Sequence, residues 1–297
     1  MQSDTIALEF VPPLLAAGAA KAREETHRLV ELAARTGLGE RLSHLMIPGM
    51  IDEDPDRPLP LEPRMDPLEV WRAIRDIAPV RAGFCTQVTP FLGPERLADR
   101  VDALVTAGIE GIIFVGVPRG MQDGEGGGLS PAEALTTFSR TIDRRGVILI
   151  PTRAGEKDRF AFKCDRGASF GLTQLLFSDA IVDLLGTFAR SADHRPEILL
   201  SFGYVPALEG RVGLIEWLIQ DPGNPRVPME QAFVARLAEL SFAEKKRELL
   251  DLYRRCVDGL QDLGFPLGLH LETPYGCSEP AFEFFAELLE DWERRRA

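Results

Sequence analysis

The sequence predicts an α/β protein, a (β/α)8 TIM barrel with an extra helical insertion before the last strand. Eight short apolar runs, rich in β-branched residues, recur along the 297 residues, and helical patterns separate them. Near-continuously apolar strands form parallel sheets that helices cover, and eight such units favour a closed barrel over an open sheet. One barrel of this length predicts a single domain, 1–297.

The expected strands follow from these runs. In chain order they are 5–10, 44–48, 82–88, 111–117, 147–151, 170–175, 198–203 and 267–271. Helix boundaries between them carry their own signals. Asp66 precedes a proline suited to a first helical turn, Ser130 and Glu133 have capping-box spacing, and Gly108 favours a left-handed helix end.

One connection is too long for a simple strand-to-strand crossing. Residues 221–262 precede the last strand, and 236–263 have a helical pattern. A structureless loop of this length is uncommon in a compact domain. We therefore expect 221–262 to be a helical insertion on the barrel.

Composition excludes several classes of function. The net charge of −12 and the pI of about 5.0 argue against nucleic acid or an anionic membrane as partner. The four cysteines include no Cys-x-x-Cys pair, and the amino-terminal segment has no signal-peptide pattern. No apolar run reaches the roughly 18–20 residues that span a bilayer. These patterns predict a soluble, cytoplasmic protein with reduced thiols.

Polar residues that end apolar strands are the candidates for chemistry, because the loops there surround the open face of a barrel. They include Glu9, Glu53 in an acidic run, Thr86, Arg119, Arg153, Gln174 and Tyr204. His270 lies within the last strand, where packing is its commoner role, and we keep it as a candidate binding residue.

Glu9 and Gln174 are the two most informative of these. Glu9 ends an apolar strand before Pro12 and Pro13, and burial there would raise its pKa toward the range useful to a general acid. A carboxylate that only caps backbone groups at the rim is the alternative. Gln174 offers donors and an acceptor to the edge of a heterocycle, although an amide satisfying backbone fits as well.

Other motifs give weaker indications of function. The acidic run 52–56 lacks the EF-hand glycine and glutamate, and the histidines are isolated, so we expect no metal. The glycines at 124–128 lack both phosphate-loop spacings and predict a flexible loop that closes over a ligand. Tyr204 is equally compatible with stacking on a planar ligand and with packing at the rim.

In order along the chain, these landmarks resemble the methylenetetrahydrofolate reductase family over nearly the whole sequence. Leu-Glu-Phe-Val-Pro-Pro around Glu9 resembles the family motif whose glutamate is the general acid. Thr-Gln at Gln174 resembles the motif whose glutamine contacts folate or cofactor, and Gly268-Leu-His-Leu-Glu-Thr resembles the last strand. The resemblance implies Glu9 as proton donor and Gln174 as a ligand-orienting residue.

Two departures bear on the cofactor. The flavoenzymes have Leu-Arg-Gly-Asp after strand four and Tyr-Pro-Glu-Gly-His after strand five, and this chain has Val117-Pro-Arg119 and Pro151-Thr-Arg153 there. The chain therefore resembles the flavin-independent, actinobacterial branch. That resemblance implies direct hydride transfer from NADH, or NADPH, to the folate in a ternary complex, without tightly bound FAD, as a step of one-carbon metabolism toward methionine.

The resemblance also implies secondary contacts. Glu53 is a candidate second carboxylate near the pterin, and the acidic folate tail needs local cations from loops at the open face. The candidates are Arg57, Arg119, Arg153 and Lys157, and a surface salt bridge is the alternative for each. The expected partners are the folate and the nicotinamide dinucleotide, bound by a monomer or a small homo-oligomer.

Three other functions remain open at this point. They are an FAD enzyme with an atypical flavin pocket, a deazaflavin-dependent barrel reductase, and a non-catalytic folate-binding barrel. An absorption spectrum, an assay with each reduced cofactor and a turnover assay distinguish them.

Overall fold

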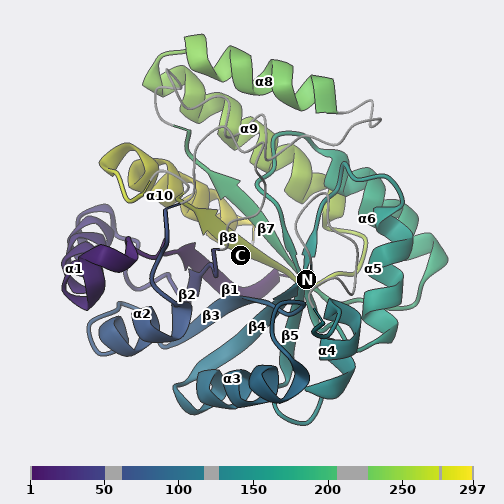
Figure 1. The fold of residues 1–297 in the computed structure, drawn as a ribbon. Helices are drawn as coiled ribbons and strands as arrows, with labels where there is room; N and C mark the ends of the chain where they lie inside the picture. Colours follow the sequence, from purple (N-terminus) through teal and green to yellow (C-terminus); the bar gives the residue numbers. More distant parts are fainter. Residues whose placement is uncertain (1, 51–61, 117–126, 206–226, 274–275, 296–297) are drawn as a thin grey trace.

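Eight parallel strands close into a barrel in sequence order, β1 to β8, in the computed structural model (Figure 1). The structure describes residues 2–50, 62–116, 127–205, 227–273 and 276–295. Each expected strand forms, which confirms the (β/α)8 prediction. The strands are β1 Gln2–Glu9, β2 His44–Ile47, β3 Ala82–Val88, β4 Ile109–Val115, β5 Arg144–Leu149, β6 Phe170–Thr173, β7 Glu197–Gly203 and β8 Leu267–Glu272.

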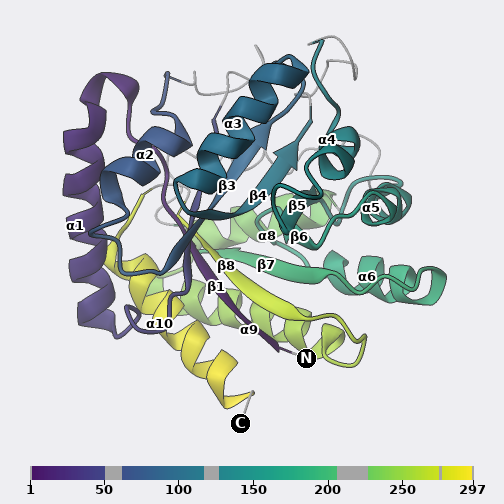
Figure 2. The same cartoon turned by 90° about the horizontal axis from the view of Figure 1, so that it is seen from below.

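Helices surround this barrel and bury its outer face (Figures 1 and 2). Their bounds are η1 Leu15–Ala17, α1 Gly18–Thr36, α2 Pro67–Ile74, α3 Pro94–Thr106, α4 Pro131–Thr137, α5 Glu156–Asp165, α6 Ala180–Ser191, α8 Val227–Glu239, α9 Phe242–Leu260 and α10 Glu279–Arg294. The ring of helices closes where α10 packs against both α1 and α9. The large apolar core lies between strands and helices.

The predicted caps form. The Asp66 side chain accepts from the Leu68 amide at the start of α2, and Ser130 and Glu133 make a reciprocal capping box at α4. Gly108 follows α3 with a φ of 93°, the left-handed conformation that glycine adopts without steric cost.

The described part of the segment before the last strand, residues 227–266, contains two helices rather than the one expected over 236–263. The break lies at residues 240–241, because Ser241 and Glu244 form a second capping box that starts α9. Helix α9 packs against α6 and α10 and so occupies the ring. Helix α8 is the additional one, lying outside α9 in Figure 1, and Arg236 of α8 bonds Glu248 of α9 at 2.7 Å. Residues 221–226 of the expected insertion lie outside the described residues.

A second, smaller core fills the barrel itself. Side chains alternate along each strand, and those that face the interior pack there. They are Ala7, Met46, Phe84, Ile113, Phe170, Leu172 and Leu199. This filling closes the middle of the barrel, so only its two ends can hold polar chemistry.

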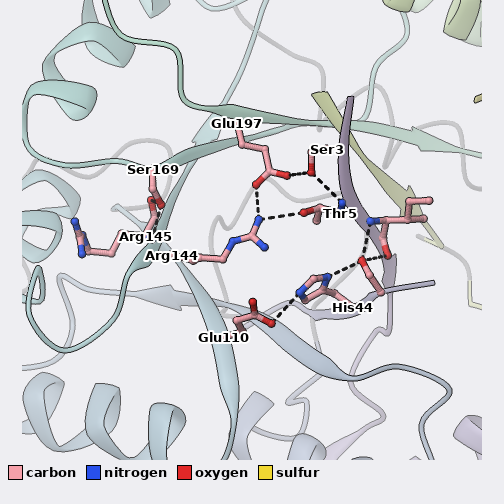
Figure 3. A network of polar contacts seen from close by, with 10 residues as sticks. Ser3, Thr5, His44, Glu110, Arg144, Arg145, Ser169 and Glu197 are labelled. Carbon is pink, nitrogen blue, oxygen red and sulfur yellow. Dashed lines mark hydrogen bonds and ion pairs between the residues drawn. The ribbon is translucent and has the colours of Figure 1, made fainter. Parts of the chain in front are cut away.

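A polar network occupies the end of the barrel where the strands begin (Figure 3). The Arg144 guanidinium pairs with Glu197, donates to the Thr5 hydroxyl at 3.2 Å, and lies over the rings of Phe84 and Phe170. Nearby, His44 Nε2 contacts Glu110 at 3.1 Å. The network also explains why β5 starts three residues before the expected 147, since its first arginine is only half-buried, lies over Phe84 and Phe170, and has a carboxylate partner.

Candidate functional site

Glu9 is the last residue of β1 and lies at the opposite end of the barrel from that network. Its carboxylate Oε2 accepts a hydrogen bond from the Thr273 amide at 2.9 Å, just past β8. The Thr273 hydroxyl returns a bond to the Glu9 carbonyl oxygen at 3.0 Å. These two bonds fix the end of β1 against the end of β8. The Glu9 carboxyl is thereby positioned by the backbone amide of Thr273.

The environment of Glu9 raises its pKa to about 7. Burial is the main cause, because it disfavours the charged form, and the negative charge of Glu272 adds to it. His270 and the Thr273 amide act in the other direction. Among the described residues, no lysine or arginine forms an ion pair with Glu9. The carboxyl is therefore partly protonated near neutral pH, as a general acid requires.

Ser201 and Glu272 lie at the same end of the barrel, and of the two Ser201 extends the site beyond the sequence prediction. His270 is buried, and its Nδ1 lies 3.5 Å from Glu272 Oε1 and 2.9 Å from Ser201 Oγ. Ser201 Oγ is also 2.6 Å from the Thr173 carbonyl oxygen. Alternation along β7 could have indicated Ser201, because it shares the interior face with Leu199.

Gln174 follows β6 directly, as expected. Its backbone N–H donates to the Leu149 carbonyl oxygen at 3.0 Å, which extends the β5–β6 pairing by one residue. Phe170 and Leu172 of the same strand pack inside the barrel, and alternation gives Gln174 the same facing. The residue is partly exposed, so it lies at the mouth on the same barrel end as Glu9.

Thr86 serves the backbone in this structure. Its hydroxyl accepts from the Gly49 amide at 2.6 Å and so ties the end of β3 to the segment after β2. A Cβ at Gly49 would lie 2.8 Å from the Thr86 carbonyl oxygen, so the close approach requires glycine. These contacts favour a structural role for Thr86 over ligand binding.

Tyr204 lies in the outer core, away from the barrel interior. Its ring packs against Phe242 of α9 and Phe284 of α10, with centroid distances of 5.5 and 6.3 Å. The strand places Ser201 and Gly203 on the interior face, which turns Tyr204 toward the helices. The rim-packing interpretation of Tyr204 is therefore favoured over stacking on a ligand.

Arg153 and Lys157 line a cavity of about 360 Å³ between the turn after β5 and the start of α6. Arg153 is exposed, and Lys157 pairs with Asp158 at 2.7 Å. A larger cavity of about 520 Å³ lies between α6 and α9. Neither cavity is lined by Glu9 or Gln174, so both are distinct from the barrel mouth.

Some predicted residues cannot be placed. Glu53, Arg57 and Arg119 lie outside the described residues, as do 124–126 of the glycine run. Gly128, which is described, packs so closely that a Cβ would lie 2.4 Å from the Leu92 carbonyl oxygen. In the part of the chain that is described, no three acidic, histidine or cysteine side chains gather as metal ligands do, and no helix could span a bilayer.

Solved structures share this fold. A protein from Clostridium thermocellum, described as binding two copies of 5-methyl-5,6,7,8-tetrahydrofolic acid, is similar with a TM-score of 0.72 and 15% identity over 99% of this chain and 96% of its own. A riboflavin lyase is similar with a TM-score of 0.54 and 11% identity, covering 100% of this chain and 92% of its own. An EDTA monooxygenase from Chelativorans sp. BNC1 is similar with a TM-score of 0.50 and 15% identity, covering 99% and 94%.

The curated proteins contain no match to this chain. A family match covers almost all of it: the mycobacterial methylenetetrahydrofolate reductase family matches residues 2–296. The chain therefore belongs to the mycobacterial methylenetetrahydrofolate reductase family.

Proposed function

We propose that this protein reduces 5,10-methylenetetrahydrofolate to 5-methyltetrahydrofolate, with NADH or NADPH passing hydride directly to the folate in a ternary complex. Family membership supports the reaction class. The folate-binding description of the Clostridium thermocellum protein supports a folate in a barrel of this shape. The observation that carries the proposal is the half-buried Glu9 carboxyl at the end of β1, which is partly protonated near neutral pH because its pKa is about 7.

Glu9 acts as the proton donor. It protonates N10 of the folate, directly or through water, and the bond between N10 and the methylene carbon breaks. The proton stays on N10, and the methylene becomes part of an N5-iminium ion. Hydride from C4 of the nicotinamide then reduces this carbon to a methyl group, which leaves NAD⁺ and ionised Glu9. Direct transfer needs the reacting carbons about 3–3.5 Å apart, so both substrates share one barrel mouth.

Gln174 orients one of the two planar ligands. Gln174 follows β6 at the same end of the barrel as Glu9. Its side-chain amide bonds a pterin or nicotinamide edge without any change of charge. Arg153, exposed beside Lys157, is the described candidate for the acidic folate tail. Glu53, Arg57 and Arg119 keep their proposed ligand contacts from sequence alone.

The absence of tightly bound FAD is part of the proposal. After β5, where the flavoenzymes carry a different motif, the acidic residue is Glu156 at the start of α5, which is buried and accepts a hydrogen bond from the Ile150 amide at 3.0 Å. A purified protein without flavin absorbance supports direct transfer, and a flavin spectrum would assign the chain to the FAD alternative.

The deciding experiment measures oxidation of NADH in the presence of methylenetetrahydrofolate for wild type and Glu9→Gln. The amide keeps the shape of the side chain and removes the proton, so we expect kcat to fall by about 10²–10⁴. Glu110→Gln is the matched control, since Glu110 lies at the other end of the barrel with a side chain 45% exposed. Near-normal turnover by Glu9→Gln would refute the assignment.

Cosubstrate comparison completes the test. Turnover with reduced deazaflavin and not with NADH would assign the deazaflavin alternative. Folate binding without turnover by any of these reductants would assign a non-catalytic barrel.

A further inference from the structure

Glu272 is a carboxyl beside the proposed acid that the mechanism above does not use. It ends β8 beside the end of β1, with its side chain 16% exposed. Two half-buried acidic groups on neighbouring strand ends resist simultaneous ionisation. The question is what fixes Glu272 in this position.

Two hydrogen bonds, from Ser201 to Thr173 and between Ser201 and His270, lead to an ion-pair contact between His270 and Glu272. The Thr173 carbonyl oxygen can only accept, so Ser201 Oγ donates its single proton there, at 2.6 Å. Ser201 Oγ must then accept from His270 Nδ1 at 2.9 Å, which places a proton on Nδ1. That Nδ1–H also faces Glu272 Oε1 at 3.5 Å. His270 Nδ1 therefore carries the proton that bonds Ser201, and Glu272 Oε1 lies beside it.

The opposite nitrogen of His270 adds a second observation. His270 is 3% exposed, and its Nε2 is buried without a hydrogen-bond partner among the described residues. The ring is thus anchored on one side only, from Ser201 toward Glu272.

The other neighbours of Glu9 carry no comparable charge. On β2, the residue paired with Glu9 is Met46, which is apolar and buried. After β8, the Thr273 amide bonds the carboxyl, and Cys277 has a thiol whose pKa burial raises to about 12, so it is neutral. Arg28 and Glu25 of α1 act on Cys277, with opposite signs. Glu272 and His270 are the titratable groups that act on Glu9 in the described chain.

We propose that Glu272 is a positioning residue that keeps Glu9 protonated between turnovers, and that the Ser201-anchored His270 holds Glu272 in place. This inference rests on the proposed function for its catalytic consequence. Its physical content, a coupling between two carboxyls, stands without it.

The test substitutes Glu272→Gln, which keeps an acceptor for His270 Nδ1–H and removes the charge. The high-pH limb of the kcat/KM profile is expected to move about one pH unit lower, so that activity falls about tenfold above neutrality and stays unchanged at low pH. Glu272→Asp, which restores a charge one methylene farther back, is expected to lie between wild type and Glu272→Gln. Lower activity at every pH with an unmoved midpoint would show a merely structural role and overturn the proposal.

A second readout separates this inference from the proposed reaction. Infrared difference spectra taken across pH follow the carbonyl band of protonated Glu9, which Glu9→Gln identifies by its loss. A lower midpoint in Glu272→Gln supports the coupling even if NADH is not oxidised. An unchanged midpoint overturns it even if turnover depends on Glu9.

Glu110→Gln is the control and is expected to leave the Glu9 midpoint unmoved. Circular dichroism establishes folding of each variant. If Glu272→Gln does not fold, Glu272→Ala tests the same loss of charge by the same infrared midpoint.

Discussion

The two ends of the barrel treat a carboxyl in opposite ways. Where the strands begin, Glu197 pairs with Arg144, whose guanidinium lies 4.7 and 5.5 Å from the ring centroids of Phe84 and Phe170. Where the strands end, Glu9 has an amide donor and a second carboxyl nearby, and no lysine or arginine pairs with it in the described chain. Figure 3 shows only the first of these ends.

The difference shows how the partner, rather than burial alone, decides what a carboxyl does. A guanidinium compensates the loss of water around a carboxylate, so the pair fastens three strands together. Without a cation, the same loss of water favours the protonated acid, which can donate its proton to a substrate. One end of the barrel is therefore suited to stability, and the other to chemistry.

The largest effect on stability is expected from Arg144→Met. The change leaves Glu197 without its cation in a partly buried site, and we expect the free energy of unfolding to fall by about 3 kcal/mol. Urea unfolding measures it. Because the site lies at the far end of the barrel, kcat of the folded variant should stay within about threefold of wild type. The double variant Arg144→Met/Glu197→Gln removes the stranded charge and should recover part of the loss; no recovery would mean that the lost packing, not the charge, dominates.

The second effect concerns pH. Glu9 has a pKa of about 7 when folded against 4.5 as its ordinary value, so the folded state holds a proton that the unfolded state has lost between these pH values. Stability must then fall as pH rises from 4.5 to 7 and level off above, by up to about 3 kcal/mol in total. Urea unfolding of wild type and Glu9→Gln at several pH values checks it. A constant difference between the two proteins across this range would contradict the raised pKa.

The smallest effect is expected at Gln174, beside the reacting groups but outside proton transfer. Gln174→Ala removes hydrogen bonds to one planar ligand, and we expect KM for folate or nicotinamide to rise about tenfold with the fold retained. Tyr204→Phe is the matched control, because Tyr204 packs in the outer core, and it should change KM by less than about twofold. Unchanged Michaelis constants in Gln174→Ala would remove Gln174 from the site.

Much of the fold could be predicted because local signals agreed with the tertiary structure. The apolar run before Glu9 becomes β1, and Asp66 and Ser130 cap the helices that they precede. The prediction failed at the start of β5, where a charged side chain lies in the barrel end. Arg144 opens β5 inside the barrel, and no local pattern indicates that a glutamate 53 residues later will neutralise it.

In the candidate site, too, some residues could be predicted from the sequence and others could not. Glu9 and Gln174 were predicted because each ends an apolar strand, and strand ends of a barrel meet at one face. The role of Tyr204 stayed open because the sequence alone does not show which side of the rim its ring occupies. Ser201 was missed, since one serine in an apolar strand gains meaning only when His270 lies opposite it on β8.

By itself, the sequence determined the barrel, its strand order and the position of an acidic residue at its mouth, because apolar periodicity and capping are local properties. Only the tertiary structure decided the chemistry of that residue. The pKa of Glu9 depends on burial and on Glu272, which lies 263 residues away along the chain and next to it in space. Charge interactions fall off with distance through space, and sequence separation does not measure that distance.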